Sequence, residues 1–210
     1  NNLGNEAKEM RWARWHTCSL CEQGYHGVVT CALSWACWKM YLGRPETEPA
    51  RIAAMTELGI GLYAAGHNED ALVVQKADLA TLRRIGASES SILDVQSNLA
   101  NTYEMLGRHE SALHMKRDVY SGRLKLHGEE NPQTLIAANN YANLLVSLER
   151  FEEAKSLLRR TVFVAQRVLG DKDETTFNSR MIYARALYED TGSTLDDLRE
   201  AVTTLQDSER

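Results

Sequence analysis

Apolar residues recur at steps of three and four along most of the chain, which is the spacing of an amphipathic α-helix. The clearest stretch runs from Phe151 to Leu169, where the apolar residues fall on one helical face. Arg159 and Arg160 fall mostly on the opposite face of that stretch. From about Glu48 onward such stretches alternate with short turns, so the sequence predicts a succession of helix, turn and helix.

The same pattern returns about every 42 residues, and two ladders of small residues mark this period. The ladders are Ala71, Ala112 and Ala154, and Gly86, Gly128 and Gly170. A single helix pair cannot bury its own apolar face, so repeated pairs stack and share a continuous core. We expect the alanines at close helix crossings and the glycines at the ends of second helices, where a left-handed conformation is needed. The predicted fold is an all-α, right-handed α-solenoid of helix pairs.

Residues 1–45 differ from the repeats, because they hold all four tryptophans and all four cysteines. Gly43 and Pro45 interrupt the helical pattern at the end of this segment. We therefore predict a Cys- and Trp-rich segment with a short helix over residues 1–45, followed by repeats over residues 46–210. The predicted repeats cover about residues 50–88, 89–130, 131–172 and 173–210, and the fourth is irregular, with an insertion at about residues 190–194.

Composition narrows the classes of function. The net charge is −5 and the isoelectric point about 5.7, so we expect no nucleic-acid partner. The longest nearly apolar run, from Gly27 to Trp38, is too short for a bilayer, which needs about 20 residues, so we expect no membrane partner. The cysteines cluster in one segment, which suits a reducing, cytoplasmic compartment. Asn1 begins no signal-peptide pattern and is not preceded by a methionine, so we expect a fragment of a longer protein.

Cys18 and Cys21 form the strongest chemical motif, because two thiolates at this spacing can bind one tetrahedral zinc ion. Two further ligands are needed, and His16 and His26 are the nearest histidines in the sequence. The two later cysteines, Cys31 and Cys37, lie in an apolar run, where a thiol behaves as a small hydrophobic group. Inert or redox-active cysteines are the alternative. We expect no cofactor in this chain alone, and zinc in the intact protein if upstream residues complete the ligand set.

Asparagines recur one repeat apart on the predicted first helices. The candidate peptide-binding residues are Asn98, Asn101, Asn139, Asn140 and Asn143, with Arg185 at the corresponding position of the fourth repeat. An asparagine offers both a donor and an acceptor, so it can bind an extended backbone without reading its sequence. Arg185 would contact an anionic group. The alternative is that these residues cap turns or solvate a face, and the first repeat carries Glu57 and Ile60 instead.

In the first two repeats an apolar residue is followed by Ala or Gly, and the motif Gly-x-x-Glu-x-Ala comes after this pair. This order resembles the tetratricopeptide repeat. The 42-residue form, with Asn139-Asn140-Tyr141-Ala142 and Arg167-Val168-Leu169-Gly170-Asp171, is similar to the repeats of kinesin light chains. The resemblance covers about residues 50–210. It implies that the first helices line a concave groove in which asparagines contact the backbone of a bound peptide.

The segment from Trp15 to Gln23 resembles one found ahead of such repeats in proteins of single-celled eukaryotes. There, Cys-x-x-Cys is similar to the closing ligand pair of a RING-like zinc finger, whose earlier ligands would lie upstream of Asn1. We therefore expect a non-catalytic scaffold or adaptor that binds peptide segments of a protein partner. One alternative is the substrate-recruiting part of a RING-type E3 ubiquitin ligase. Another is the regulatory repeat region of an enzyme whose catalytic domain lies outside this chain.

Overall fold

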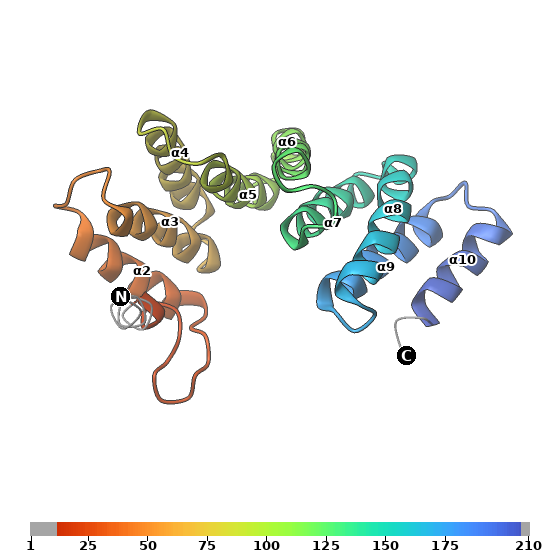
Figure 1. Ribbon diagram of the computed structural model, residues 1–210, viewed down its shortest axis with the longest axis horizontal. Helices are drawn as coiled ribbons and strands as arrows, with labels where there is room; N and C mark the ends of the chain where they lie inside the picture. The colour runs from red at the N-terminus through yellow and green to blue at the C-terminus, as the bar shows by residue number, and fades with distance from the viewer. Residues whose placement is uncertain (1–11, 207–210) are drawn as a thin grey trace. The chain divides into compact units, whose positions relative to one another are not determined.

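The computed structural model describes residues 12–206, which form α-helices joined by short connections and contain no β-strand (Figure 1). The helices are α2 (Gly27–Tyr41), α3 (Pro49–Ala64), α4 (Asn68–Arg84), α5 (Glu89–Met105), α6 (His109–His127), α7 (Pro132–Ser147), α8 (Phe151–Leu169), α9 (Glu174–Glu189) and α10 (Leu195–Gln206). The all-α class is therefore confirmed. From α3 onward each predicted repeat contains two helices that follow one another along the chain, here called a pair. The predicted boundary at residue 45 falls in the connection between α2 and α3.

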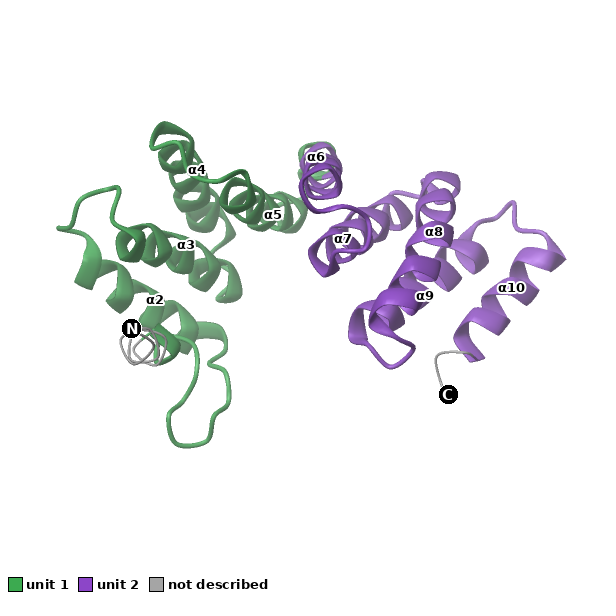
Figure 2. Cartoon of the chain, in the orientation of Figure 1, with its two compact units in different colours: residues 1–112 green, residues 113–210 purple. Residues whose placement is uncertain are grey.

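The chain divides into two compact units, residues 1–112 and residues 113–210, and the boundary falls in the first turn of α6 (Figure 2). In unit 1, α2 packs against α3, α3 against α4, and α4 against α5. In unit 2, α7 packs against α8, α8 against α9, and α9 against both α7 and α10. Among the described residues, no helix has the length and apolar character that crossing a membrane requires.

The ladders of small residues lie where the period predicts. Ala71, Ala112 and Ala154 are each 0% exposed. Ala71 of α4 packs against Leu58 and Leu62 of α3. Gly86, Gly128 and Gly170 each follow a second helix with φ of 68°, 80° and 89°, so glycine provides the left-handed conformation that ends those helices. The predicted burial of the alanines and the predicted glycine conformation are confirmed.

The turn inside each pair also uses a left-handed residue, and the third pair does so without glycine. Gly66 and Gly107 have φ of 80° and 69° in the first two pairs. Glu149 takes the corresponding position in the third pair with φ of 58°. A side chain in this region of conformational space is strained, because its Cβ approaches the neighbouring backbone. The fourth pair has a different connection, since residues 190–194 separate α9 from α10 at the predicted insertion.

Tryptophans join the N-terminal segment to the first pair. Trp15 is buried against Cys37 of α2 and Ala54 of α3, and Trp12 and Trp38 pack around this cluster. These three tryptophans thus pack the N-terminal segment onto the first pair. Trp35 differs, because it lies on the outer side of α2 and is 42% exposed.

Candidate interaction surface on the first helices

Side-chain caps fix the starts of α7 and α9, the two helices that carry the C-terminal half of the candidate surface. Asn131 Oδ1 accepts a hydrogen bond from Gln133 N at 2.9 Å, and Pro132 takes the first helical position. Asp173 Oδ1 accepts one from Thr175 N at 2.8 Å at the start of α9. Because the caps occupy equivalent places in their repeats, equivalent residues of α7 and α9 lie side by side.

Asn143 of α7 and Arg185 of α9 meet on this surface. Arg185 Nη1 donates to Asn143 Oδ1 at 3.1 Å and Nη2 donates to Ser147 Oγ at 3.2 Å. Arg185 Nε donates to Glu189 Oε2 at 3.3 Å, and 32% of the Arg185 side chain is exposed. Asn140 is half-buried, and its amide makes no hydrogen bond within the described residues. We call these five residues the α7–α9 face.

Asn139 is buried and connects α7 to α9. It is 6% exposed, its Nδ2 donates to Thr175 O at 3.1 Å, and its Oδ1 accepts from Ser179 Oγ at 2.8 Å. Both partners lie on α9, so Asn139 ties α7 to α9 from within unit 2. Its amide is therefore already used between the helices.

Asn98 and Asn101 lie on α5 in unit 1, where both are half-buried. The corresponding residue of α3, Glu57, lies 3.4 Å from His16 Nδ1 of the N-terminal segment. Burial raises the pKa of Glu57, and the nearby His16 opposes that shift. Ile60, the other residue that replaces an asparagine in the first repeat, is 37% exposed. In the first repeat, one candidate position is thus occupied by a contact with the chain's own N-terminal segment.

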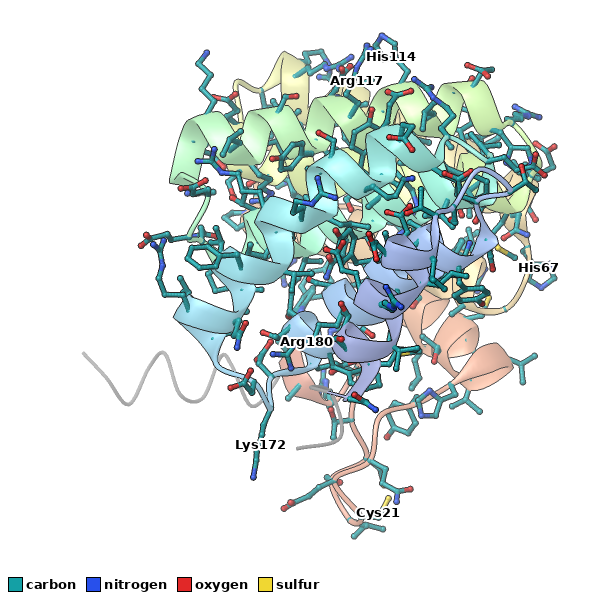
Figure 3. All side chains as sticks on the ribbon, turned by 90° about the vertical axis from the view of Figure 1, so that its right-hand side faces the viewer. Cys21, His67, His114, Arg117, Lys172 and Arg180 are labelled. Carbon is teal, nitrogen blue, oxygen red and sulfur yellow. The ribbon has the colours of Figure 1, made fainter. Side chains whose placement is uncertain are left out.

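Cys18 and Cys21 lie on a tight loop, and Cys21 is exposed at its end (Figure 3). Cys18 N donates to Gln23 O and Glu22 N donates to Cys18 O, both at 2.9 Å, while Glu22 adopts φ of 57°. The backbone N–H groups of Cys21 and Leu20, together with the Cys21 thiol, lower the pKa of Cys18. The loop thus directs donors at the Cys18 sulfur and favours its thiolate.

This donor set fits half of a zinc site. Cys18 and Cys21 supply two thiols, but the described residues contain no group of three or more His, Cys, Asp or Glu that could hold a metal. His16 instead contacts Glu57, and His26 precedes α2 as an exposed N-cap residue. The four cysteines are free thiols. Burial raises the pKa of Cys37 to about 11, which agrees with its expected role as a small hydrophobic group.

Two buried charged groups were missed by the motif search, although each interrupts a repeat ladder. Asp78 occupies the position of Val119 in the second repeat, is 1% exposed, and accepts from Thr56 Oγ1 at 2.7 Å. Lys155 occupies the position of a leucine in the first two repeats, and its Nζ lies 2.8 Å from Asp190 Oδ2. The sequence signal for these two groups was a polar residue at a repeat position where other repeats carry an apolar one.

Comparison with known proteins agrees with this architecture. Residues 91–162 match the family model described as tetratricopeptide repeat. Residues 91–162 thus contain tetratricopeptide repeats. No curated protein matches the chain at a significant level.

Solved structures place these repeats among kinesin light chain-like folds. A Podosopora anserina protein described as a kinesin light chain with nearly identical TPR-like repeats aligns with a TM-score of 0.70 and 23% identity. That match covers 86% of this chain and 84% of the other, and a single-residue variant gives a TM-score of 0.71 over the same shares. BtubC (BKLC) of P. vanneervenii aligns with a TM-score of 0.61 and 15% identity over 85% of this chain and 84% of its own. These likenesses establish the fold.

Proposed function

We propose that this chain is a non-catalytic protein-interaction scaffold whose tetratricopeptide repeats bind an extended segment of a partner protein along their first helices. The single observation that supports the peptide site best is the adjacency of Asn143 and Arg185, one repeat apart on neighbouring first helices. Asn140 lies one turn earlier on α7 with its amide hydrogen-bonding groups unused within the described residues. A backbone N–H and C=O of an extended segment can therefore pair with one asparagine amide.

Arg185 defines the chemistry of the preferred segment. Its guanidinium now bonds the neutral oxygens of Asn143 and Ser147 and one carboxylate, that of Glu189. A partner carboxylate could replace the Ser147 contact and form a charge-assisted hydrogen bond, which is stronger than a neutral one. The proposed partner is thus a segment with an acidic residue near Arg185, and affinity should fall as salt is added.

A titration of wild type and variants tests the proposal. The partner segment would first be captured on the full chain and mapped to a synthetic peptide, whose affinity is then measured by fluorescence anisotropy. Asn140→Ala with Asn143→Ala should weaken binding about tenfold, since each lost hydrogen bond costs about 0.5–1.5 kcal/mol. Gln166→Ala, an exposed change on α8, is the matched control and should bind as wild type. Equal affinity for the double variant and wild type would refute the peptide site.

The Cys18–Cys21 loop supports one alternative, the substrate-recruiting part of a RING-type E3 ubiquitin ligase. The loop supplies two thiols, with backbone donors directed at one of them, which is half of a tetrahedral zinc site. Zinc analysis of this chain should then give little bound metal, and a longer chain with upstream ligands should hold zinc that Cys18→Ser releases. A zinc-free longer chain would exclude this alternative and leave the plain scaffold.

A further inference from the structure

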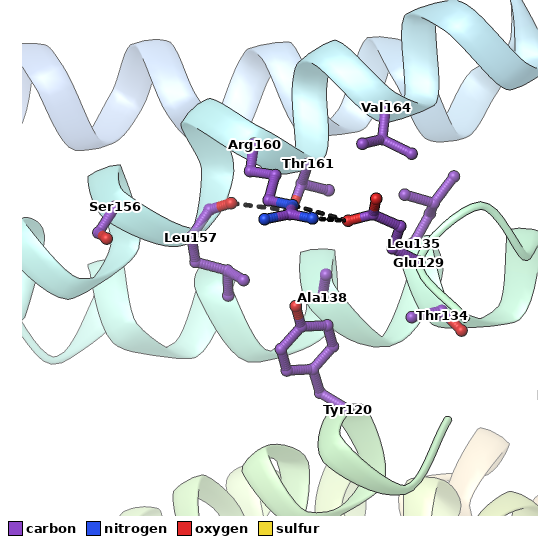
Figure 4. A pocket seen from close by; sticks show the side chains of 10 residues that line it. All are labelled: Tyr120, Glu129, Thr134, Leu135, Ala138, Ser156, Leu157, Arg160, Thr161 and Val164. Atoms are coloured by element: carbon purple, nitrogen blue, oxygen red, sulfur yellow. Dashed lines mark hydrogen bonds and ion pairs between the residues drawn. The ribbon is translucent and has the colours of Figure 1, made fainter. Parts of the chain in front are cut away.

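Unit 2 contains a cavity of about 140 Å³ that shares no residue with the α7–α9 face (Figure 4). It lies between the second half of α6, the start of α7 and the middle of α8. Its apolar lining comes from Leu135 and Ala138 of α7 and from Leu157 and Val164 of α8. The Tyr120 hydroxyl of α6 points into it, toward Ala138 (Figure 4).

A small residue at position 138 accounts for the cavity. The repeat register pairs Ala138 with Gln96 in the second repeat and with Arg180 in the fourth. Arg180 is 3% exposed, and its guanidinium bonds Asp171, so a long side chain fills the corresponding place within unit 2. Ala138 ends at Cβ and leaves that volume unfilled. The third repeat thus differs from the fourth at position 138, where the smaller side chain leaves room for a cavity.

Tyr120 gives the cavity one directed polar group. Its ring stacks on Tyr141 with centroids 6.5 Å apart and an interplanar angle of 24°, which holds the hydroxyl in place. Burial raises the pKa of Tyr120, so the hydroxyl stays a neutral donor at pH 7, and it has no partner within the described residues. The buried Thr134 hydroxyl also lacks a partner, but so does Thr176 at the equivalent place, so we assign the directed donor role to Tyr120.

Charges at the edge of the cavity cancel one another. Arg160 Nε donates to Glu129 Oε2 at 2.7 Å, and this ion pair lies beside the apolar lining (Figure 4). An ionised ligand would have to separate this pair or enter an apolar space unpaired, and both are unfavourable. The cavity therefore suits a neutral group.

We infer that this cavity binds a neutral apolar group about the size of a benzene ring, with one acceptor for the Tyr120 hydroxyl. Size supports this class, since an apolar protein cavity of about 150 Å³ accommodates benzene. A free small molecule and a side chain of a partner protein share this chemistry. Either would bind outside the α7–α9 face, so the inference does not depend on the proposed peptide site.

Anisole and ethylbenzene are a matched pair of probes, because they have nearly the same shape and only anisole carries an acceptor. We expect saturable shifts of the Leu157 and Val164 methyl resonances in NMR titrations of the full chain with each probe. Tyr120→Phe should lower the affinity ratio of anisole to ethylbenzene about 3- to 10-fold, which corresponds to one hydrogen bond of about 0.5–1.5 kcal/mol. Ala138→Leu should abolish binding of both probes by filling the cavity.

Controls keep the outcome interpretable. Ala138→Gln, which introduces the residue of the second repeat, is a second blocking variant if Ala138→Leu does not fold by circular dichroism. Asn140→Ala, on the α7–α9 face, should leave both probes bound. Tighter binding of N-acetyl-phenylalanine methylamide than of anisole would support the inference with a partner side chain as the source, and weaker binding would support it with a free molecule. Absence of saturable methyl shifts, or unchanged shifts in folded Ala138→Leu, would overturn it.

Discussion

The carboxyl group of Asp78 predicts how unit 1 responds to pH. Asp78 lies in α4, is 1% exposed, and accepts one hydrogen bond, from Thr56 Oγ1 to its Oδ2 at 2.7 Å. Its Oδ1 has no partner within the described residues. Burial raises the pKa of Asp78 from 3.8 to about 6, although the Thr56 hydrogen bond opposes the shift. The folded state therefore holds the proton more tightly than the unfolded state.

The pH dependence of unit 1 stability follows from the difference between the folded and unfolded pKa of Asp78. Well below pH 3.8 the group is protonated in both states, so it does not penalise folding. Between pH 4 and about 6 the unfolded chain releases the proton first, and stability falls as pH rises. A shift of about 2 pKa units corresponds to about 3 kcal/mol, lost once pH passes the raised pKa.

Asp78→Val, with the residue of the second repeat, tests this estimate. Thr56 Oγ1 can still donate to Ile52 O, which lies 3.3 Å away, so the variant leaves no orphaned hydroxyl. We expect the variant to be about 2–3 kcal/mol more stable than wild type at pH 7.5 and only about 1 kcal/mol more stable at pH 4.5. Urea unfolding followed by tryptophan fluorescence measures unit 1 alone, because all four tryptophans lie between Trp12 and Trp38.

Asp70→Asn, an exposed change on the same helix, should keep the pH dependence of wild type. The difference in unfolding free energy between wild type and Asp78→Val isolates Asp78 from other groups that titrate in this range. If that difference stays constant from pH 4.5 to 7.5, or if Asp78→Val is less stable at pH 7.5, the reasoning is refuted.

Three further changes test how the repeats are built. Glu149→Gly should stabilise unit 2 by about 1 kcal/mol in urea unfolding followed by circular dichroism, because φ of 58° strains any residue with a Cβ. Gly61→Ala should destabilise unit 1 by about 1–3 kcal/mol and weaken amide-exchange protection of α2, since the added Cβ would lie 2.6 Å from Ser34 Cβ. Asp190→Asn should destabilise unit 2 more than Lys155→Leu does, because it removes a partner of a buried ammonium. Lys155 lowers the pKa of Asp190, so wild type should lose this stabilisation as pH falls through the lowered pKa, as acid unfolding measures.

Regular features of the sequence predicted the fold, because repeat spacing is set by packing that recurs in every helix pair. The alanines at 71, 112 and 154 are fully buried and the glycines at 86, 128 and 170 have positive φ, so packing and backbone conformation favour these residues there. The insertion before α10 was also predictable, since it shifts Ala201 out of the ladder. The 42-residue repeat register therefore identified the helix ends marked by glycine and the buried alanine positions.

The candidate site was only partly predictable. Register placed Asn139, Asn143 and Arg185 on successive first helices, but it did not show which side of α7 meets α9. Asn139 lies on that side and is buried, whereas Asn143 reaches Arg185 at the partly exposed surface. The cavity beside Ala138 was not predicted, because an alanine in a helix gives no sign of a cavity until the equivalent Arg180 is found buried.

Hydrogen–deuterium exchange of the full chain, with and without its captured partner peptide, tests the central claim most directly. A segment bound at the α7–α9 face should slow amide exchange in α7 and α9 and leave α8 and α10 unchanged. The Asn140→Ala, Asn143→Ala variant should lose this protection at the same peptide concentration. Protection confined to α8 and α10, and retained in the double variant, would contradict the account.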